Sequence, residues 1–136
     1  MREITEIIVH CTATPEGREV SVREIDRWHR SRGWAGIGYH YVIYPDGSVH
    51  GGREEEKVGA HCSGHNRNSI GVVYVGGLDR DGQKPKDTRT EAQKKSLLSV
   101  LRMLRKKYPK ARIYGHRDFA AKACPSFDAK SEYRDI

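Results

Sequence analysis

Three residues in the last quarter of the chain carry side chains that could serve a metal site. The stretch GHRDFAAKACPSFD, at 115–128, places His116, Lys122 and Cys124 within nine residues. Together with His10, in VHCTAT at 9–14, His116 and Cys124 make a set of two histidines and one cysteine. A catalytic zinc typically has three such protein ligands and an open position for water. Lys122 could then stabilise the negative charge that develops on an attacked carbonyl oxygen.

The spacing of these residues does not by itself assemble a site. No pair of candidate ligands has the short spacing of a zinc knuckle or an HExxH helix, so Cys124 could also be a buried small residue, half of a disulfide or a nucleophile. The odd number of cysteines, which are Cys11, Cys62 and Cys124, argues against a disulfide framework. We expect Cys11 and Cys62 to be reduced. A nucleophilic pair of Cys11 and His10 is disfavoured because neighbours on a strand point to opposite faces.

Two of the candidate ligands stand at the ends of predicted strands. Short apolar runs predict strands over 4–10 and 111–116, which end at His10 and His116. Strand ends that lead into loops commonly carry ligand chemistry in α/β sheets. Caps, turns and periodicity predict the other elements, which are a helix over 21–33, a hairpin over 39–50, a strand over 69–77 and a helix from 90 to about 108. This order predicts a single α/β domain over 1–136, with helices packed on one mixed sheet.

Composition excludes several classes of protein. Hydrophobic residues make up 36% of the chain and charged residues 32%, and no stretch approaches the roughly 20 apolar residues of a membrane span. We expect no signal peptide and no membrane insertion, and therefore synthesis in the cytoplasm. The formal net charge is +7, with basic clusters at 27–33 and 102–112. We interpret these clusters as solvated helix faces, and we do not expect nucleic acid as a partner, since only the charge excess favours it.

Four motifs, in this order along the chain, carry a family resemblance: VHCTAT (9–14), GYHYVIYPDGSVHGGR (38–53), GAHCSGHNRNSIGVVYVGG (59–77) and GHRDFAAKACPSFD (115–128). Together they resemble the zinc N-acetylmuramoyl-L-alanine amidases of the short phage-lysozyme type, which share a fold with the peptidoglycan recognition proteins. The resemblance implies a mixed sheet of about five strands, flanked by helices, with one zinc ion in a surface groove.

The resemblance also assigns roles to individual residues. It implies zinc ligation by His10, His116 and Cys124, and catalytic roles for Tyr39 and Lys122. Segments that line the substrate groove in the family contain His61, Asn66 and Arg53, which we expect to contact sugar or peptide.

The activity implied is hydrolysis of the amide bond between the lactyl group of N-acetylmuramic acid and L-alanine of the stem peptide. We expect a monomeric phage or prophage endolysin that binds bacterial peptidoglycan and reaches the wall after the membrane is breached. Two alternatives are a peptidoglycan-binding module without catalysis, disfavoured by the complete set of site residues, and a cytoplasmic amidase that recycles soluble wall fragments.

Overall fold

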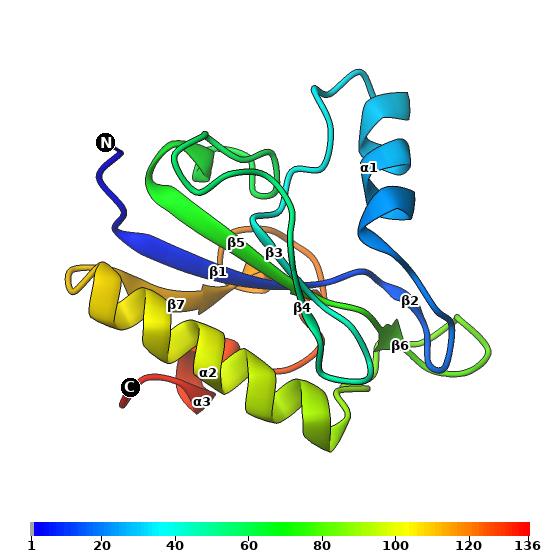
Figure 1. Ribbon diagram of the computed structural model, residues 1–136. Coiled ribbons are helices and arrows are strands. Elements are labelled where there is room, and N and C mark those ends of the chain that lie inside the picture. The colour runs from blue at the N-terminus through cyan, green and yellow to red at the C-terminus, as the bar shows by residue number, and fades with distance from the viewer. Residues whose placement is uncertain (1) are drawn as a thin grey trace.

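A five-stranded mixed sheet forms the centre of the molecule, and the computed structural model describes it within residues 2–136 (Figure 1). The strands lie in the order β4 (Val49–Gly51), β3 (Tyr41–Ile43), β5 (Ser69–Tyr74), β1 (Glu6–Cys11) and β7 (Arg112–Gly115). Only β4 runs antiparallel to its neighbour; β3, β5, β1 and β7 are parallel. The predicted mixed sheet is confirmed, and β7 is one of its edges.

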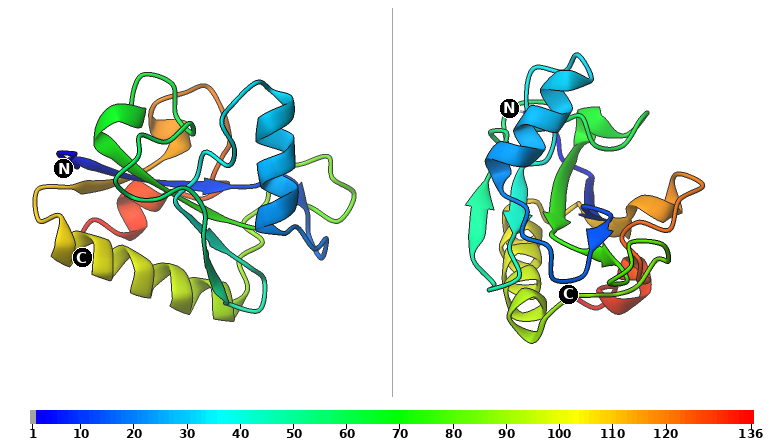
Figure 2. Two further views of the ribbon diagram at one scale, coloured as in Figure 1. Left: turned by 45° about the horizontal axis from the view of Figure 1, so that its top comes forward. Right: turned by 90° about the vertical axis from the view of Figure 1, so that its right-hand side faces the viewer.

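Helices cover both faces of this sheet (Figure 1, Figure 2). One core joins the sheet to α2 (Glu91–Lys107) and α3 (Ala129–Glu132), and the other joins it to α1 (Val22–Ser31). The predicted helices and strands are confirmed with small shifts at their ends. Among residues 2–136, no helix combines the length and apolar character that a membrane span needs.

The alternation of side chains along β1 decides which face carries His10. Ile7, Val9 and Cys11 pack in the core under α2, so His10 points to the opposite face, toward α1. Cys11 therefore lies on the other side of the sheet from His10, which agrees with the objection to a nucleophilic pair.

Local signals explain where the helices begin. Ser21 caps α1 by accepting a hydrogen bond from the backbone N–H of Glu24, and Gly33, with a φ of +87°, follows its end. Thr90 and Gln93 form a complete capping box at the start of α2.

Three short elements were not predicted. They are α3 and a second sheet of two strands, β2 (Thr14–Pro15) and β6 (Gly77–Leu78). Two residues per strand, or four per helix, are too few to show a hydrophobic period. Two single turns of 3₁₀ helix, η1 (Asn66–Asn68) and η2 (His116–Asp118), were not predicted either.

Candidate active site

Parallel pairing of β1 with β7 brings the two strand-end histidines together. The register aligns Val9 with Gly115. His10 and His116, the next residue on each chain segment, therefore lie together at the carboxyl ends of the two strands, with ring centroids 4.6 Å apart. The sequence separates these residues by more than a hundred positions, and only strand pairing makes them neighbours.

A closed loop returns Cys124 to the same place. The backbone N–H of Arg117 donates to the carbonyl of Cys124 at 2.8 Å, which ties the end of the loop to its beginning. The hydroxyl of the buried Tyr74 then donates to the carbonyl of Pro125 at 2.7 Å. Cys124 also accepts a hydrogen bond at its Sγ from the backbone N–H of Cys11, at 3.2 Å. These contacts hold the thiol beside His10.

The three side chains have the separation that a zinc site requires. Ligand atoms of His10, His116 and Cys124 all lie within 4.8 Å of one another, and Cys124 Sγ lies 3.9 Å from His10 Nδ1. Tetrahedral zinc with bonds of about 2.3 Å to sulfur and about 2.0 Å to nitrogen holds such a pair about 3.5 Å apart. The donor set therefore fits zinc with small side-chain movements.

The electrostatics of the site favour neutral imidazoles, the form that binds a metal. Burial, followed by the neighbouring His61 and His116, lowers the pKa of His10 well below its ordinary value. Burial and then Lys122 lower the pKa of His116. The hydrogen bond with Cys11 and then burial raise the pKa of the Cys124 thiol, so a metal that binds there must displace its proton.

His61 contacts the ring nitrogen of His10 that faces away from Cys124. Its Nδ1 is 2.8 Å from His10 Nε2, and its Nε2 is 3.1 Å from the hydroxyl of Ser69. Gly71 makes this approach possible, because a Cβ there would lie only 2.7 Å from the His61 ring. Both ring nitrogens of His61 are thus engaged within the protein, and its side chain is buried. His61 thus contacts a candidate metal ligand and also lines the cleft described below, and its contact with substrate stays a prediction.

Tyr39 borders the same site. Its ring centroid lies 5.1 Å from that of His10, and its side chain is half-buried. The preceding Gly38 donates its N–H to His29 Nδ1 at 2.8 Å, and a Cβ on Gly38 would overlap the carbonyl oxygen of Ala60. Only glycine fits at position 38, where the backbone that leads into Tyr39 passes close to Ala60. Burial, and then the nearby Cys124, raise the pKa of Tyr39 above its ordinary value, so the phenol is neutral at neutral pH.

A cleft of about 480 Å³ opens beside these residues. Its walls include Arg32, Trp34, His61, Asn66, His116, Phe119 and Lys122. The Lys122 side chain is exposed and has no ion-pair partner within residues 2–136. Trp34 is 37% exposed, and the guanidinium of Arg32 lies 5.4 Å from its ring centre. Arg32, Trp34 and Phe119 are cleft residues that sequence reasoning missed; a tryptophan directly after a helix-ending glycine was the available signal for Trp34.

The other two predicted substrate contacts, of Arg53 and Asn66, also stay predictions, and the structure shows which backbone groups each side chain binds. Arg53 lies outside this cleft, and its guanidinium donates to the backbone carbonyls of Gly36, Ile37 and Val58. Asn66 lines the cleft, but its Oδ1 accepts from the backbone N–H groups of His61 and Cys62. Both side chains hold loops in place.

Comparison with known proteins gives one family. The N-acetylmuramoyl-L-alanine amidase family matches residues 1–127. The chain is 47% identical to the endolysin of Enterobacteria phage K11 over 127 residues, covering 93% of this chain and 83% of that protein. It is 49% identical to the endolysin of Escherichia phage T7 over 130 residues, covering 95% and 85%.

Solved structures agree with this family. The N-acetylmuramoyl-L-alanine amidase LysC of Clostridium intestinale superposes with a TM-score of 0.82 at 30% identity, covering 96% of this chain and 82% of that one. A bumblebee peptidoglycan recognition protein superposes with a TM-score of 0.80 at 24% identity, covering 99% and 83%, which shows a shared fold.

Proposed function

The chain belongs to the N-acetylmuramoyl-L-alanine amidase family, and from this premise we propose that it is a zinc-dependent endolysin of phage type. It hydrolyses the amide bond that joins N-acetylmuramic acid to L-alanine in bacterial peptidoglycan. Endolysins at 47% and 49% identity support the activity. The single observation that carries the zinc dependence is the cluster of ligand atoms of His10, His116 and Cys124 within 4.8 Å.

His10 Nδ1, a ring nitrogen of His116 and Cys124 Sγ would hold the zinc. When bound, zinc supplies a Lewis acid and lowers the pKa of water from about 16 to about 7. His61 orients His10, because its Nδ1 accepts the Nε2–H of His10 and so leaves Nδ1 of His10 available to the metal.

Two side chains act on the amide itself in this proposal. Tyr39 is neutral because its pKa is raised, so its hydroxyl positions the attacking water or the amide by hydrogen bonding and does not act as a free base. Lys122 is a cation at the mouth of the cleft. It stabilises the negative charge that develops on the carbonyl oxygen as the amide is attacked.

Zinc stoichiometry and amide cleavage, measured together, test this proposal. Wild type should bind one zinc ion and release new L-alanine amino termini from purified sacculi. Cys124→Ser should lose both while keeping its circular dichroism spectrum and cooperative unfolding. Cys62→Ser is the matched control, since Cys62 is a cysteine of the cleft outside the ligand cluster, and it should keep both properties.

The outcomes are distinct. Retention of zinc and cleavage by Cys124→Ser would show that the third ligand is assigned wrongly. A wild-type protein that binds zinc but releases no amino termini would be a binding module rather than an enzyme.

A further inference from the structure

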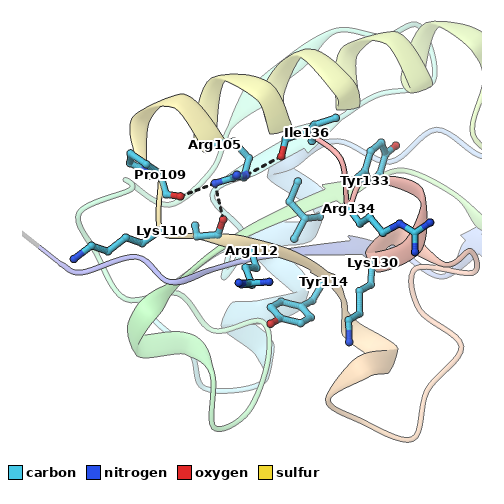
Figure 3. A pocket seen from close by; sticks show the side chains of 11 residues that line it. Arg105, Pro109, Lys110, Arg112, Tyr114, Lys130, Tyr133, Arg134 and Ile136 are labelled. Atoms are coloured by element: carbon cyan, nitrogen blue, oxygen red, sulfur yellow. Dashed lines mark hydrogen bonds between the residues drawn. The ribbon is translucent and has the colours of Figure 1, made fainter.

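A second cavity, of about 620 Å³, lies beside the edge strand β7, between the end of α2 and α3 (Figure 3). Its lining includes five basic residues, which are Arg105, Lys110, Arg112, Lys130 and Arg134, together with Tyr114 and Tyr133. No Asp or Glu lines it. We refer to this feature as the basic cavity.

Four of the five cations lack a carboxylate or hydrogen-bond partner among the residues that the structure describes. Lys110, Arg112, Lys130 and Arg134 are exposed, and none makes an ion pair or side-chain hydrogen bond within residues 2–136. Arg105 differs, because its guanidinium donates to the carbonyls of Ile136, Pro109 and Ala111 (Figure 3). Like charges gathered around one concavity repel each other, and a bound anion relieves that repulsion. The positive charge of the cavity therefore suits a ligand that carries several negatively charged groups.

Strand geometry and ring contacts connect the basic cavity to the catalytic cleft. Arg112 and Tyr114 are two positions apart on β7 and so lie on one face of it, where Figure 3 shows them beside Lys130. The ammonium of Lys130 lies 5.6 Å from the Tyr114 ring centre. The Tyr114 ring lies 4.9 Å from that of Phe119, which lines the cleft. A chain leaving the cleft over Phe119 thus meets Tyr114 and then the cations.

Building on the proposed function, we propose that the basic cavity is an extended subsite that binds the carboxylates of a neighbouring stem peptide of the wall polymer. The polymer repeats the unit that is cut, so further carboxylate-bearing stems lie close to the one in the cleft. A soluble fragment with a single stem fills the cleft alone. The cavity therefore acts on binding of intact wall and leaves the chemical step unchanged. Part of the basic cluster at 102–112, interpreted above as a solvated helix face, contributes to this subsite through Lys110 and Arg112.

A pair of charge-matched double variants tests the proposal. Arg112→Gln/Lys130→Gln removes two cations from the basic cavity. Lys95→Gln/Arg102→Gln removes two exposed cations of α2 that do not line it. Initial rates are measured at low and high salt on purified sacculi and on a soluble muramoyl peptide with one stem. Binding to sacculi is measured in parallel by co-sedimentation.

For the cavity variant we expect KM on sacculi to rise about fivefold at low salt, since exposed ion contacts are individually weak. The difference should shrink at high salt because these charges are screened. The value of kcat on sacculi and both constants on the soluble peptide should equal wild type, and the control variant should match wild type throughout.

Three results would overturn the subsite. Equal effects of the two double variants would mean that only net charge matters. A loss on the soluble peptide would place the effect in the cleft. Binding of a single-stranded oligonucleotide that depends on Arg112 and Lys130, with sacculus binding unchanged, would make the cavity a nucleic-acid site. Failure of the proposed function appears differently, as a wild type that cleaves neither substrate, and co-sedimentation then still decides whether the cavity binds wall.

Discussion

At the scale of single residues, we infer from the contact between His61 and His10 that His61 sets which nitrogen of His10 would face the candidate metal. The 2.8 Å contact between His61 Nδ1 and His10 Nε2 leaves His10 Nδ1 toward Cys124, and the Ser69 hydroxyl at 3.1 Å holds the far side of the His61 ring. A fixed tautomer and ring orientation reduce the rearrangement that metal binding demands.

We therefore predict that His61→Ala lowers zinc affinity about 10- to 100-fold, as loss of an outer hydrogen-bond partner of a metal ligand typically does. Competition with a chromophoric chelator measures this affinity. His61→Gln, which keeps a carbonyl acceptor, should recover part of it. His65→Ala is the control, because His65 pairs with Glu6 away from the ligand cluster. An unchanged affinity in His61→Ala would contradict the orienting role.

A second residue-scale prediction concerns acid stability. Burial, and then Arg32, lower the pKa of His29 from 6.5 to about 4, and its Nδ1 accepts the N–H of Gly38. Between these two pKa values the unfolded chain binds a proton that the folded protein does not. The contribution of neutral His29 to the free energy of unfolding is therefore fully present above about pH 6.5, and it declines as the pH falls toward about 4.

Replacing His29 should reduce this decline. Urea unfolding between pH 7 and pH 4 should give a shallower loss of unfolding free energy for His29→Gln than for wild type, by on the order of 1 kcal/mol at pH 5. His50→Gln, on the hairpin strand β4, serves as the comparison. Parallel pH profiles for wild type and His29→Gln would show that His29 does not contribute.

At the scale of elements, α2 is joined to the sheet by a buried polar side chain as well as by leucines. Gln93 is fully buried, and its Nε2 donates to the carbonyls of Ile43 at 3.2 Å and Val75 at 3.0 Å. Its Oε1 accepts the N–H of Thr90 at 2.9 Å. One side chain therefore binds the start of the helix, the last residue of β3 and the residue that follows β5, which fixes the position of α2 along the sheet.

Gln93→Ala should accordingly destabilise the fold by about 2–3 kcal/mol, because it removes three hydrogen bonds of a buried side chain and leaves the carbonyl of Val75 without this donor. Thermal and urea unfolding measure the change. Lys94→Ala, one position along on the exposed face, should stay within about 0.5 kcal/mol of wild type. Similar effects of the two substitutions would mean that water replaces Gln93 without cost.

At the scale of the whole molecule, Arg89 anchors the C-terminal segment that follows Cys124. Its side chain is 2% exposed and pairs with Asp87 and Glu132. Its guanidinium carbon lies 3.4 Å from the ring centre of Phe127. The loop before α2 is thus bound to α3, and the segment between Cys124 and α3 is held against the core.

Arg89→Leu should destabilise the protein by about 1–2 kcal/mol, since it removes the hydrogen bonds that the buried guanidinium makes to Asp87, Glu132 and Tyr133, while both carboxylates stay accessible to water. It should also weaken zinc binding, because Phe127 lies three residues after Cys124. Unfolding curves and chelator competition test both effects, and Lys86→Leu, which removes only the exposed pair with Glu16, is the comparison. Loss of stability with unchanged zinc affinity would separate the anchor from the metal site.

The sequence alone determined the local elements and the identities of the candidate catalytic groups. Periodicity and capping are local properties, so the helix beginning at Thr90 and the strand ending at His10 could be predicted, and four motifs in family order named the candidate ligands. Partners distant in sequence depend on strand pairing and loop closure, which no local pattern contains. Only the tertiary structure therefore placed His61 against His10, turned Arg53 onto backbone carbonyls, and gathered Arg112 and Lys130 around one cavity.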